Sequence, residues 1–183
     1  EAGRAVYHAR EEIAKLVNLE NPLNVAFTSS ATESLNLIVS SLVRPGDHVI
    51  TTVLEHNSIL RPLYLSGCTL DILDCDDKGR LFISDLREMI KLETKYVFLT
   101  HGSNVLGNIS DIESIYNFCR EKGIKLVLDC AQTLGSLKVT CNMADILCFT
   151  GHKAIFGPQG TGGIIINDSE SLNFKISKTG GTG

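Results

Sequence analysis

A lysine and an aspartate in the second half of the chain could hold one particular kind of cofactor. Lys153 ends the run Thr150-Gly151-His152-Lys153, and Asp129 and Gln132 lie a short distance upstream on a different predicted element. A lysine amine can form a Schiff base with an aldehyde, and a buried carboxylate can hold a protonated pyridine nitrogen. The two residue types together indicate pyridoxal 5'-phosphate (PLP), which carries both an aldehyde and a pyridine ring.

The chain that positions these residues alternates between short apolar runs and helical patterns. Such alternation is typical of an α/β fold with a mostly parallel sheet. Seven runs rich in β-branched or apolar residues predict strands, which are Asn24 to Thr28, His48 to Leu54, Thr69 to Asp74, Tyr96 to Thr100, Lys125 to Asp129, Asp145 to Phe149 and Gly163 to Asn167.

Three helices can be placed between or before these strands. Ser30-Ala31-Thr32-Glu33 has the capping-box form S-x-x-E and predicts a helix that ends before Pro45-Gly46. Ser110-Asp111-Ile112-Glu113 repeats that form and predicts a helix that stops at Gly123. Residues 1–17 indicate a helix without a cap or a preceding strand, and both ends of the chain look cut, so we expect a piece of a longer protein.

The polar candidates all follow predicted strands. In open α/β sheets, ligands bind at the carboxyl ends of the strands, where helix N-termini offer free N–H groups to anions. Each candidate group follows one strand: Ser29-Ser30-Ala31-Thr32 the first, Glu55-His56-Asn57 the second, Ser103-Asn104 the fourth, Asp129 the fifth, and Thr150-Gly151-His152-Lys153 the sixth. Every candidate therefore lies where such a sheet binds its ligand.

Charge and composition exclude several kinds of partner. The 183 residues are 43% hydrophobic, and the net charge is -4 with a pI near 5.7. An acidic chain lacks the excess positive charge that would attract nucleic acid or an anionic membrane. No apolar run approaches the roughly 20 residues needed to span a bilayer. The six cysteines form no C-x-x-C pair, so we interpret them as reduced packing residues of a cytoplasmic protein, with no metal site.

Six segments form an ordered series across essentially the whole chain. They are Phe27 to Asn36, Pro45 to Ile50, Glu55 to Ser58, Ser103 to Gly107, Asp129 to Gln132, and Thr150 to Lys153 leading to Gly157-Pro158-Gln159-Gly160. In this order they resemble the motifs of the class V aminotransferase family of fold-type-I PLP enzymes, and within it the cysteine desulfurase and selenocysteine lyase branch. Any one segment is a weak signal, but six in order are too many for coincidence.

The resemblance implies a fold and a domain organisation. The implied fold is a three-layer sandwich, in which a mainly parallel seven-stranded sheet lies between helices and its last strand is antiparallel. Residues 1–183 are expected to be an incomplete PLP-binding large domain, because family members also carry a further N-terminal segment and a smaller C-terminal domain that supplies an arginine for the substrate carboxylate. A homodimer is also implied, because fold-type-I sites are built from two subunits.

The resemblance also implies roles for individual residues. Lys153 holds the cofactor as a Schiff base and moves protons at the substrate carbons, while His56 lies over the ring and acts as an acid or base. Asp129 pairs with the ring nitrogen and Gln132 donates to the phenolic oxygen of the ring. Asn104 positions the substrate carboxylate or the ring oxygen. The residues implied to hold the phosphate are Ala31, Thr32, Thr150 and His152, with Thr182 reaching the phosphate of the neighbouring subunit.

Several of these residues have a structural alternative. Asp129 could cap the following helix, His56 could be a partly buried histidine bonded to backbone, and Thr32 with Ser30 could form only a capping box. The stretch Gly160-Thr161-Gly162-Gly163 resembles a phosphate-binding loop but lacks a strand before and a helix after it, so we interpret it as a turn into the last strand.

Two functions of different class remain open. The first is a PLP-dependent transferase or lyase, foremost a cysteine desulfurase that converts L-cysteine to alanine in the full-length protein, with a selenocysteine lyase or another class V enzyme as the alternative. The second is a non-catalytic fragment that keeps only the fold and the dimer surface. Four intact residues favour the enzyme, namely Lys153, Asp129, Gln132 and His56. No cysteine matches the sulfur-accepting thiol of the family, and the missing substrate machinery predicts that the isolated chain is inactive.

Overall fold

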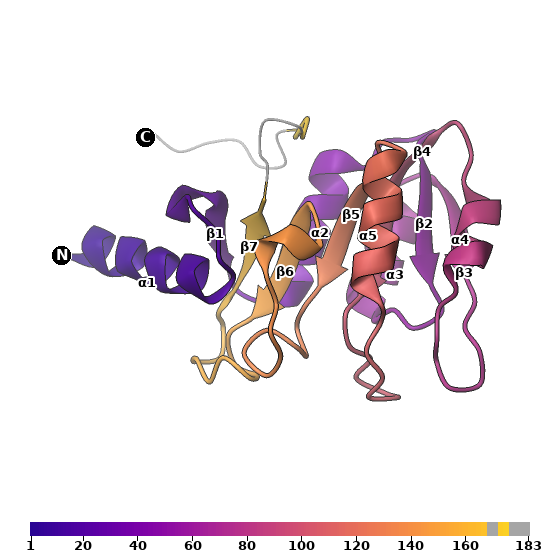
Figure 1. The fold of residues 1–183 in the computed structure, drawn as a ribbon. Coiled ribbons are helices and arrows are strands. Elements are labelled where there is room, and N and C mark those ends of the chain that lie inside the picture. The colour runs from indigo at the N-terminus through magenta and orange to yellow at the C-terminus, as the bar shows by residue number, and fades with distance from the viewer. Residues whose placement is uncertain (168–171, 176–183) are drawn as a thin grey trace.

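Seven strands form one sheet in the computed structural model, which describes residues 1–167 and 172–175 (Figure 1). Their order across the sheet is β1-β7-β6-β5-β4-β2-β3. The strands are β1 (Val25–Thr28), β2 (His48–Thr52), β3 (Thr69–Leu73), β4 (Thr94–Thr100), β5 (Lys125–Asp129), β6 (Ile146–Thr150) and β7 (Gly162–Ile166).

Strand direction follows the predicted scheme. β7 pairs antiparallel with both β1 and β6, and the other neighbouring pairs are parallel. The mainly parallel sheet with an antiparallel last strand is therefore confirmed. β5 has the predicted limits, and each other strand differs from its prediction by one or two residues at one or both ends. β2 ends at Thr52 rather than Leu54, because the Leu54 N–H bonds to the Thr52 hydroxyl and turns the chain.

Helices cover both faces of the sheet and make the predicted three layers (Figure 1). On one face, α2 and α3 pack against Phe98 and its neighbours, and on the other, α4 and α5 pack against Leu99 and its neighbours. Adjacent strand residues serve opposite cores because side chains alternate along a strand. The helices are α1 (Ala2–Leu16), α2 (Ala31–Leu42), α3 (Asn57–Leu65), α4 (Ile83–Met89) and α5 (Ile112–Glu121), with 3-10 turns η1 (Pro22–Asn24) and η2 (Cys141–Met143).

One of the two predicted capping boxes is wrong. At α2, the Ser30 hydroxyl accepts the Glu33 N–H at 3.1 Å, as expected. At α5, the cap is Asp111 instead of Ser110, and its carboxylate accepts from Ser114. The Ser110 hydroxyl instead donates to the Thr100 carbonyl at 3.1 Å, because Ser110 is pulled back against the end of β4.

Two helices lie where the sequence analysis placed none. α3 begins directly after His56 and contains Pro62, and α4 is a short helix after Phe82. α1 matches the predicted N-terminal helix, and only its last turn is packed, through Ala14. No helix among the described residues is long and apolar enough to cross a membrane.

Candidate active site

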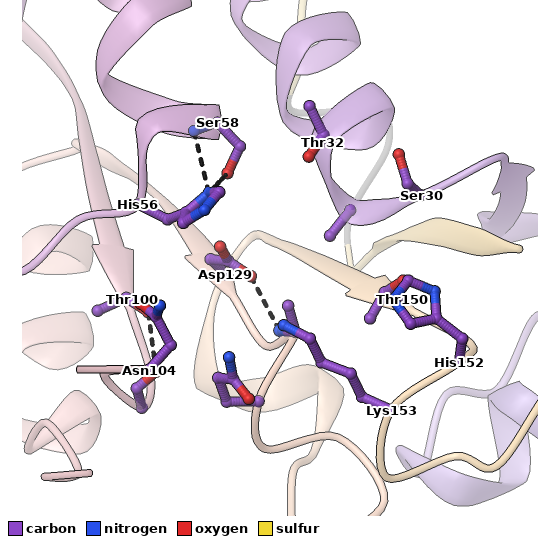
Figure 2. Close-up of a pocket in the computed structure, with 14 residues that line it drawn as sticks. Ser30, Thr32, His56, Ser58, Thr100, Asn104, Asp129, Thr150, His152 and Lys153 are labelled. Carbon is purple, nitrogen blue, oxygen red and sulfur yellow. Dashed lines mark hydrogen bonds between the residues drawn. The ribbon is translucent and has the colours of Figure 1, made fainter. Parts of the chain in front are cut away.

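The predicted site residues meet in one pocket at the carboxyl edge of the sheet (Figure 2). Its walls come from the turns after β1, β2, β4, β5 and β6, which are far apart in sequence. The pocket is lined by Ser30, Ala31, Thr32, His56, Ser58, Thr100, Gly102, Asn104, Asp129, Ala131, Gln132, Thr150, His152 and Lys153. Thr182 lies outside the described residues.

Asp129 ends β5 at the centre of this pocket. Its side chain is buried and accepts the Ala131 N–H at 2.8 Å. Burial raises the pKa of Asp129 above its ordinary value, while the bond from Ala131 and the charges of Lys153 and His56 lower it in part. A buried carboxylate of this kind suits a cationic partner, which would restore the lost solvation.

Lys153 enters the pocket from the turn after β6. Figure 2 shows its side chain extending toward Asp129. The loop lies against Gly135, whose backbone has φ +100, and a Cβ atom at Gly135 would come within 2.6 Å of the Ala154 carbonyl oxygen. The turn that follows Gln132 therefore sets the position of the lysine loop through direct backbone packing.

His56 is the N-cap of α3 and lines the pocket on the β2 side. Its Nδ1 accepts the Ser58 N–H at 3.2 Å and lies 2.8 Å from the Ser58 hydroxyl. Because Nδ1 accepts from backbone, we assign the ring proton to Nε2, which leaves Nε2–H as a donor. The histidine is thus bonded to backbone, as in the structural alternative, and still faces the site.

Groups that could hold an anion lie on the opposite side of the pocket. The N-terminus of α2 brings the N–H groups of Ala31 and Thr32 there, and the first N–H groups of a helix have no partner within the helix. Thr150 and His152 face them (Figure 2), and the Thr150 hydroxyl lies 3.1 Å from His152 Nδ1. The α2 terminus sits close because β7 contributes Gly162 beside Ser30, where a Cβ would come within 2.6 Å of the Ser30 carbonyl carbon.

The remaining predicted residues, Gln132 and Asn104, also line the pocket. The sequence analysis did not identify Ser58 and Thr100 as lining residues. A signal existed for Ser58, since it follows a histidine by two residues at a helix start, but nothing near Thr100 in the sequence distinguishes it from other strand-end threonines.

The residues present fit PLP on chemical grounds. Asp129 is a buried acid that could hold a protonated ring nitrogen, Lys153 is an amine that could bond an aldehyde, and the α2 terminus with Thr150 and His152 could hold a phosphate. In Figure 2 the Lys153 side chain reaches toward Asp129, and Thr32, Thr150 and His152 lie to one side of this pair.

The fold is the one seen in the large domain of PLP-dependent cysteine desulfurases. The apo cysteine desulfurase of Thermococcus onnurineus NA1 superposes with a TM-score of 0.88 and 33% identity, over 96% of this chain and 46% of that chain. DndA from Streptomyces lividans gives a TM-score of 0.88 and 29% identity, over 98% of this chain and 54% of that chain.

The chain belongs to the class V aminotransferase family, whose model matches residues 1–183. This family is PLP-dependent. The cysteine desulfurase IscS of Photobacterium profundum is 34% identical over 99% of this chain and 46% of its own length. A probable cysteine desulfurase of Pyrococcus abyssi is 36% identical over 87% of this chain and 41% of its own length. The chain spans about half the length of the curated relatives it matches.

Proposed function

We propose that this chain is the PLP-binding part of a cysteine desulfurase, which in its full-length form converts L-cysteine to alanine and passes the sulfur to an acceptor thiol. The observation that carries the proposal is the meeting of Lys153, Asp129, Gln132 and His56 in one pocket. Similarity to proteins named cysteine desulfurase favours this reaction over that of a selenocysteine lyase or another class V enzyme.

Each residue contributes a distinct task in this proposal. PLP, when bound, supplies an electron sink for negative charge that develops at the substrate α-carbon. Asp129 would hold the ring nitrogen in its protonated form, and Gln132 would donate to the phenolic oxygen. Lys153 would bind the aldehyde carbon and, once its amine is released, would carry the α-proton. His56 lines the pocket with its Nδ1 bonded to Ser58, which leaves its Nε2 to serve as acid or base.

Binding and orientation come from the pocket walls. The N–H groups of Ala31 and Thr32, with Thr150 and His152, hold the phosphate and so fix the ring beside Asp129. Asn104 orients the substrate carboxylate or the ring oxygen. The substrate-binding arginine and the sulfur-accepting thiol are assigned to parts of the protein beyond this chain, and residues 1–183 remain an incomplete large domain in the proposal.

A homodimer and a cytoplasmic location complete the proposal. Val105 and Leu106, beside Asn104, are 82% and 56% exposed, and an apolar surface next to the pocket suits a second subunit. The six cysteines are free thiols, as expected in a reducing compartment. Sedimentation of the full-length protein tests the dimer, which a monomer at all concentrations contradicts.

The experiment that tests the function uses the full-length protein with PLP, L-cysteine and a thiol reductant. We expect equal amounts of alanine and sulfide, and loss of both in Lys153→Ala. The exposed Lys138, changed to alanine, is the matched control and should leave the rate unchanged. Formation of a keto acid without sulfide would show an aminotransferase instead, and turnover by the isolated 183 residues would contradict the assignment of substrate machinery to the rest of the protein.

A further inference from the structure

Glu55 is a buried acid that the proposed reaction does not use. It immediately precedes His56 and is 8% exposed. Its Oε1 accepts two hydrogen bonds, from the Thr52 hydroxyl at 2.7 Å and from the Thr100 N–H at 2.9 Å. Its Oε2 is buried without a hydrogen-bond partner in the described part of the chain. An orphaned carboxyl oxygen is costly to bury and calls for an explanation.

The two bonds at Oε1 join strands whose ladder has ended. β2 and β4 pair only as far as Ile50 and Val97. Beyond that point, side chains make the hydrogen bonds between the two strands. The Thr51 hydroxyl donates to the Phe98 carbonyl at 3.2 Å, and the Glu55 carboxyl accepts from the Thr100 N–H. Glu55 therefore holds the end of β2, and with it the start of the His56 turn, against β4.

A second buried carboxyl stands on the next strand. Asp129 lies directly opposite Thr100 in the β4–β5 register, so the group that donates to Glu55 is a cross-strand neighbour of Asp129. Burial, and to a smaller extent the Asp129 charge, raise the pKa of Glu55 to about 8, although the bonds from Thr52 and Thr100 oppose this. Two like charges this close in a buried site disfavour joint ionisation.

The surrounding charges decide which acid ionises. The charge of Lys153 acts on Asp129 and lowers its pKa, whereas no cation in the described part of the chain acts appreciably on Glu55. The buried His101 after β4 bonds Thr133, and burial lowers its pKa, so it adds no compensating charge. Because Oε1 already accepts two bonds, the Glu55 proton belongs on Oε2, where an unpaired neutral hydroxyl costs less to bury than an unpaired carboxylate oxygen.

We propose that Glu55 is a positioning residue of the pocket that stays protonated on Oε2, ties β2 to β4, and leaves Asp129 as the ionised acid that receives the ring nitrogen. This inference rests on the proposed function, because only a bound PLP ring gives Asp129 a nitrogen to hold. Ionisation of Glu55 at alkaline pH adds a second negative charge near Asp129, the acid that receives the ring nitrogen, and so couples cofactor binding to pH.

The first test needs no cofactor. Infrared titration of the apo chain from about pH 6 to about pH 10 follows the carbonyl stretch of protonated carboxyls. We expect a buried group in the wild type that titrates near pH 8, that is missing in Glu55→Gln, and that titrates at lower pH in Asp129→Asn. Glu88→Gln, at an exposed glutamate of α4, is the control and should leave the titration unchanged. Glu55 ionised at pH 7, or unmoved in Asp129→Asn, overturns the proposal.

The second test measures the PLP dissociation constant against pH for the wild type and Glu55→Gln. Glutamine keeps an oxygen acceptor for Thr52 and Thr100, so this variant should fold, which circular dichroism checks. We expect equal affinity at neutral pH and wild-type binding that becomes about tenfold tighter than that of the variant above pH 8, as for opposite charges at close range. Identical pH profiles overturn the positioning role. If the wild type does not bind PLP at all, the proposed function is refuted instead. The apo titration still decides whether Glu55 is protonated and coupled to Asp129.

Discussion

Replacing Gly135 by alanine is expected to destabilise the fold and to displace the loop that carries Lys153. Gly135 has φ +100, a backbone region that costs an L-residue about 1–3 kcal/mol. The added Cβ would also lie 2.6 Å from the Ala154 carbonyl oxygen and 2.9 Å from the Ile155 nitrogen, and such overpacking costs about 1–3 kcal/mol. The two effects together lower the free energy of unfolding by about 2–6 kcal/mol.

Gly123→Ala separates the two causes. Gly123 has φ +70, but a Cβ there would meet nothing within 4 Å, so only the backbone cost applies. In urea, Gly135→Ala should unfold with a midpoint at a clearly lower urea concentration than Gly123→Ala. Labelling of Lys153 by PLP and borohydride should fall in Gly135→Ala alone. Equal stability of the two variants, with equal labelling, would refute the close packing between the Gly135 turn and the lysine loop.

Three further changes test the α2 cap, the ion pairs of Asp71 and the buried Glu55. Ser30→Ala removes the α2 cap and should lower the free energy of unfolding in urea by about 1 kcal/mol. A hydrogen bond from Lys91, and to a smaller extent one from His48, lowers the pKa of Asp71, so its contribution to stability is present above pH 4 and is lost in acid. Asp71→Asn should lower the free energy of unfolding by about 0.5–1 kcal/mol at neutral pH and weaken its fall at acid pH. The raised pKa of Glu55 means that the folded state holds an extra proton between pH 4.5 and about 8. The free energy of unfolding therefore falls as the pH rises over that range, by up to about 5 kcal/mol. Glu55→Gln should abolish this pH dependence, as measured by thermal unfolding. An unchanged profile in any of the three variants contradicts the corresponding contact.

The site residues could be predicted because their signals are local. Asp129, Thr150 and Lys153 follow apolar strands, and a parallel sheet brings the carboxyl ends of its strands to one edge. Ser30 carries a local capping signal that the structure keeps. Which of these residues bind the cofactor stays a prediction, because the fold brings them together without assigning their tasks.

The parts that could not be predicted depend on contacts distant in sequence. Glu55 follows the second predicted strand, but its burial depends on β4, from which the Thr100 N–H approaches its carboxyl group. Ser110 lost its capping role to Asp111 because the β4 end offered a carbonyl acceptor. α3 was missed since its cap is a histidine and Pro62 lies inside it, where propensity argues against a helix.

The central claim is that this pocket binds PLP through Lys153. The most direct measurement is the visible absorption spectrum of the purified chain with PLP, followed by borohydride reduction and peptide mass analysis. We expect a visible band that reduction removes, with the cofactor left covalently on Lys153, and neither result in Lys153→Arg, whose guanidinium keeps the charge but cannot form the adduct. Labelling spread over exposed lysines such as Lys138, equal in the wild type and Lys153→Arg, would contradict the claim.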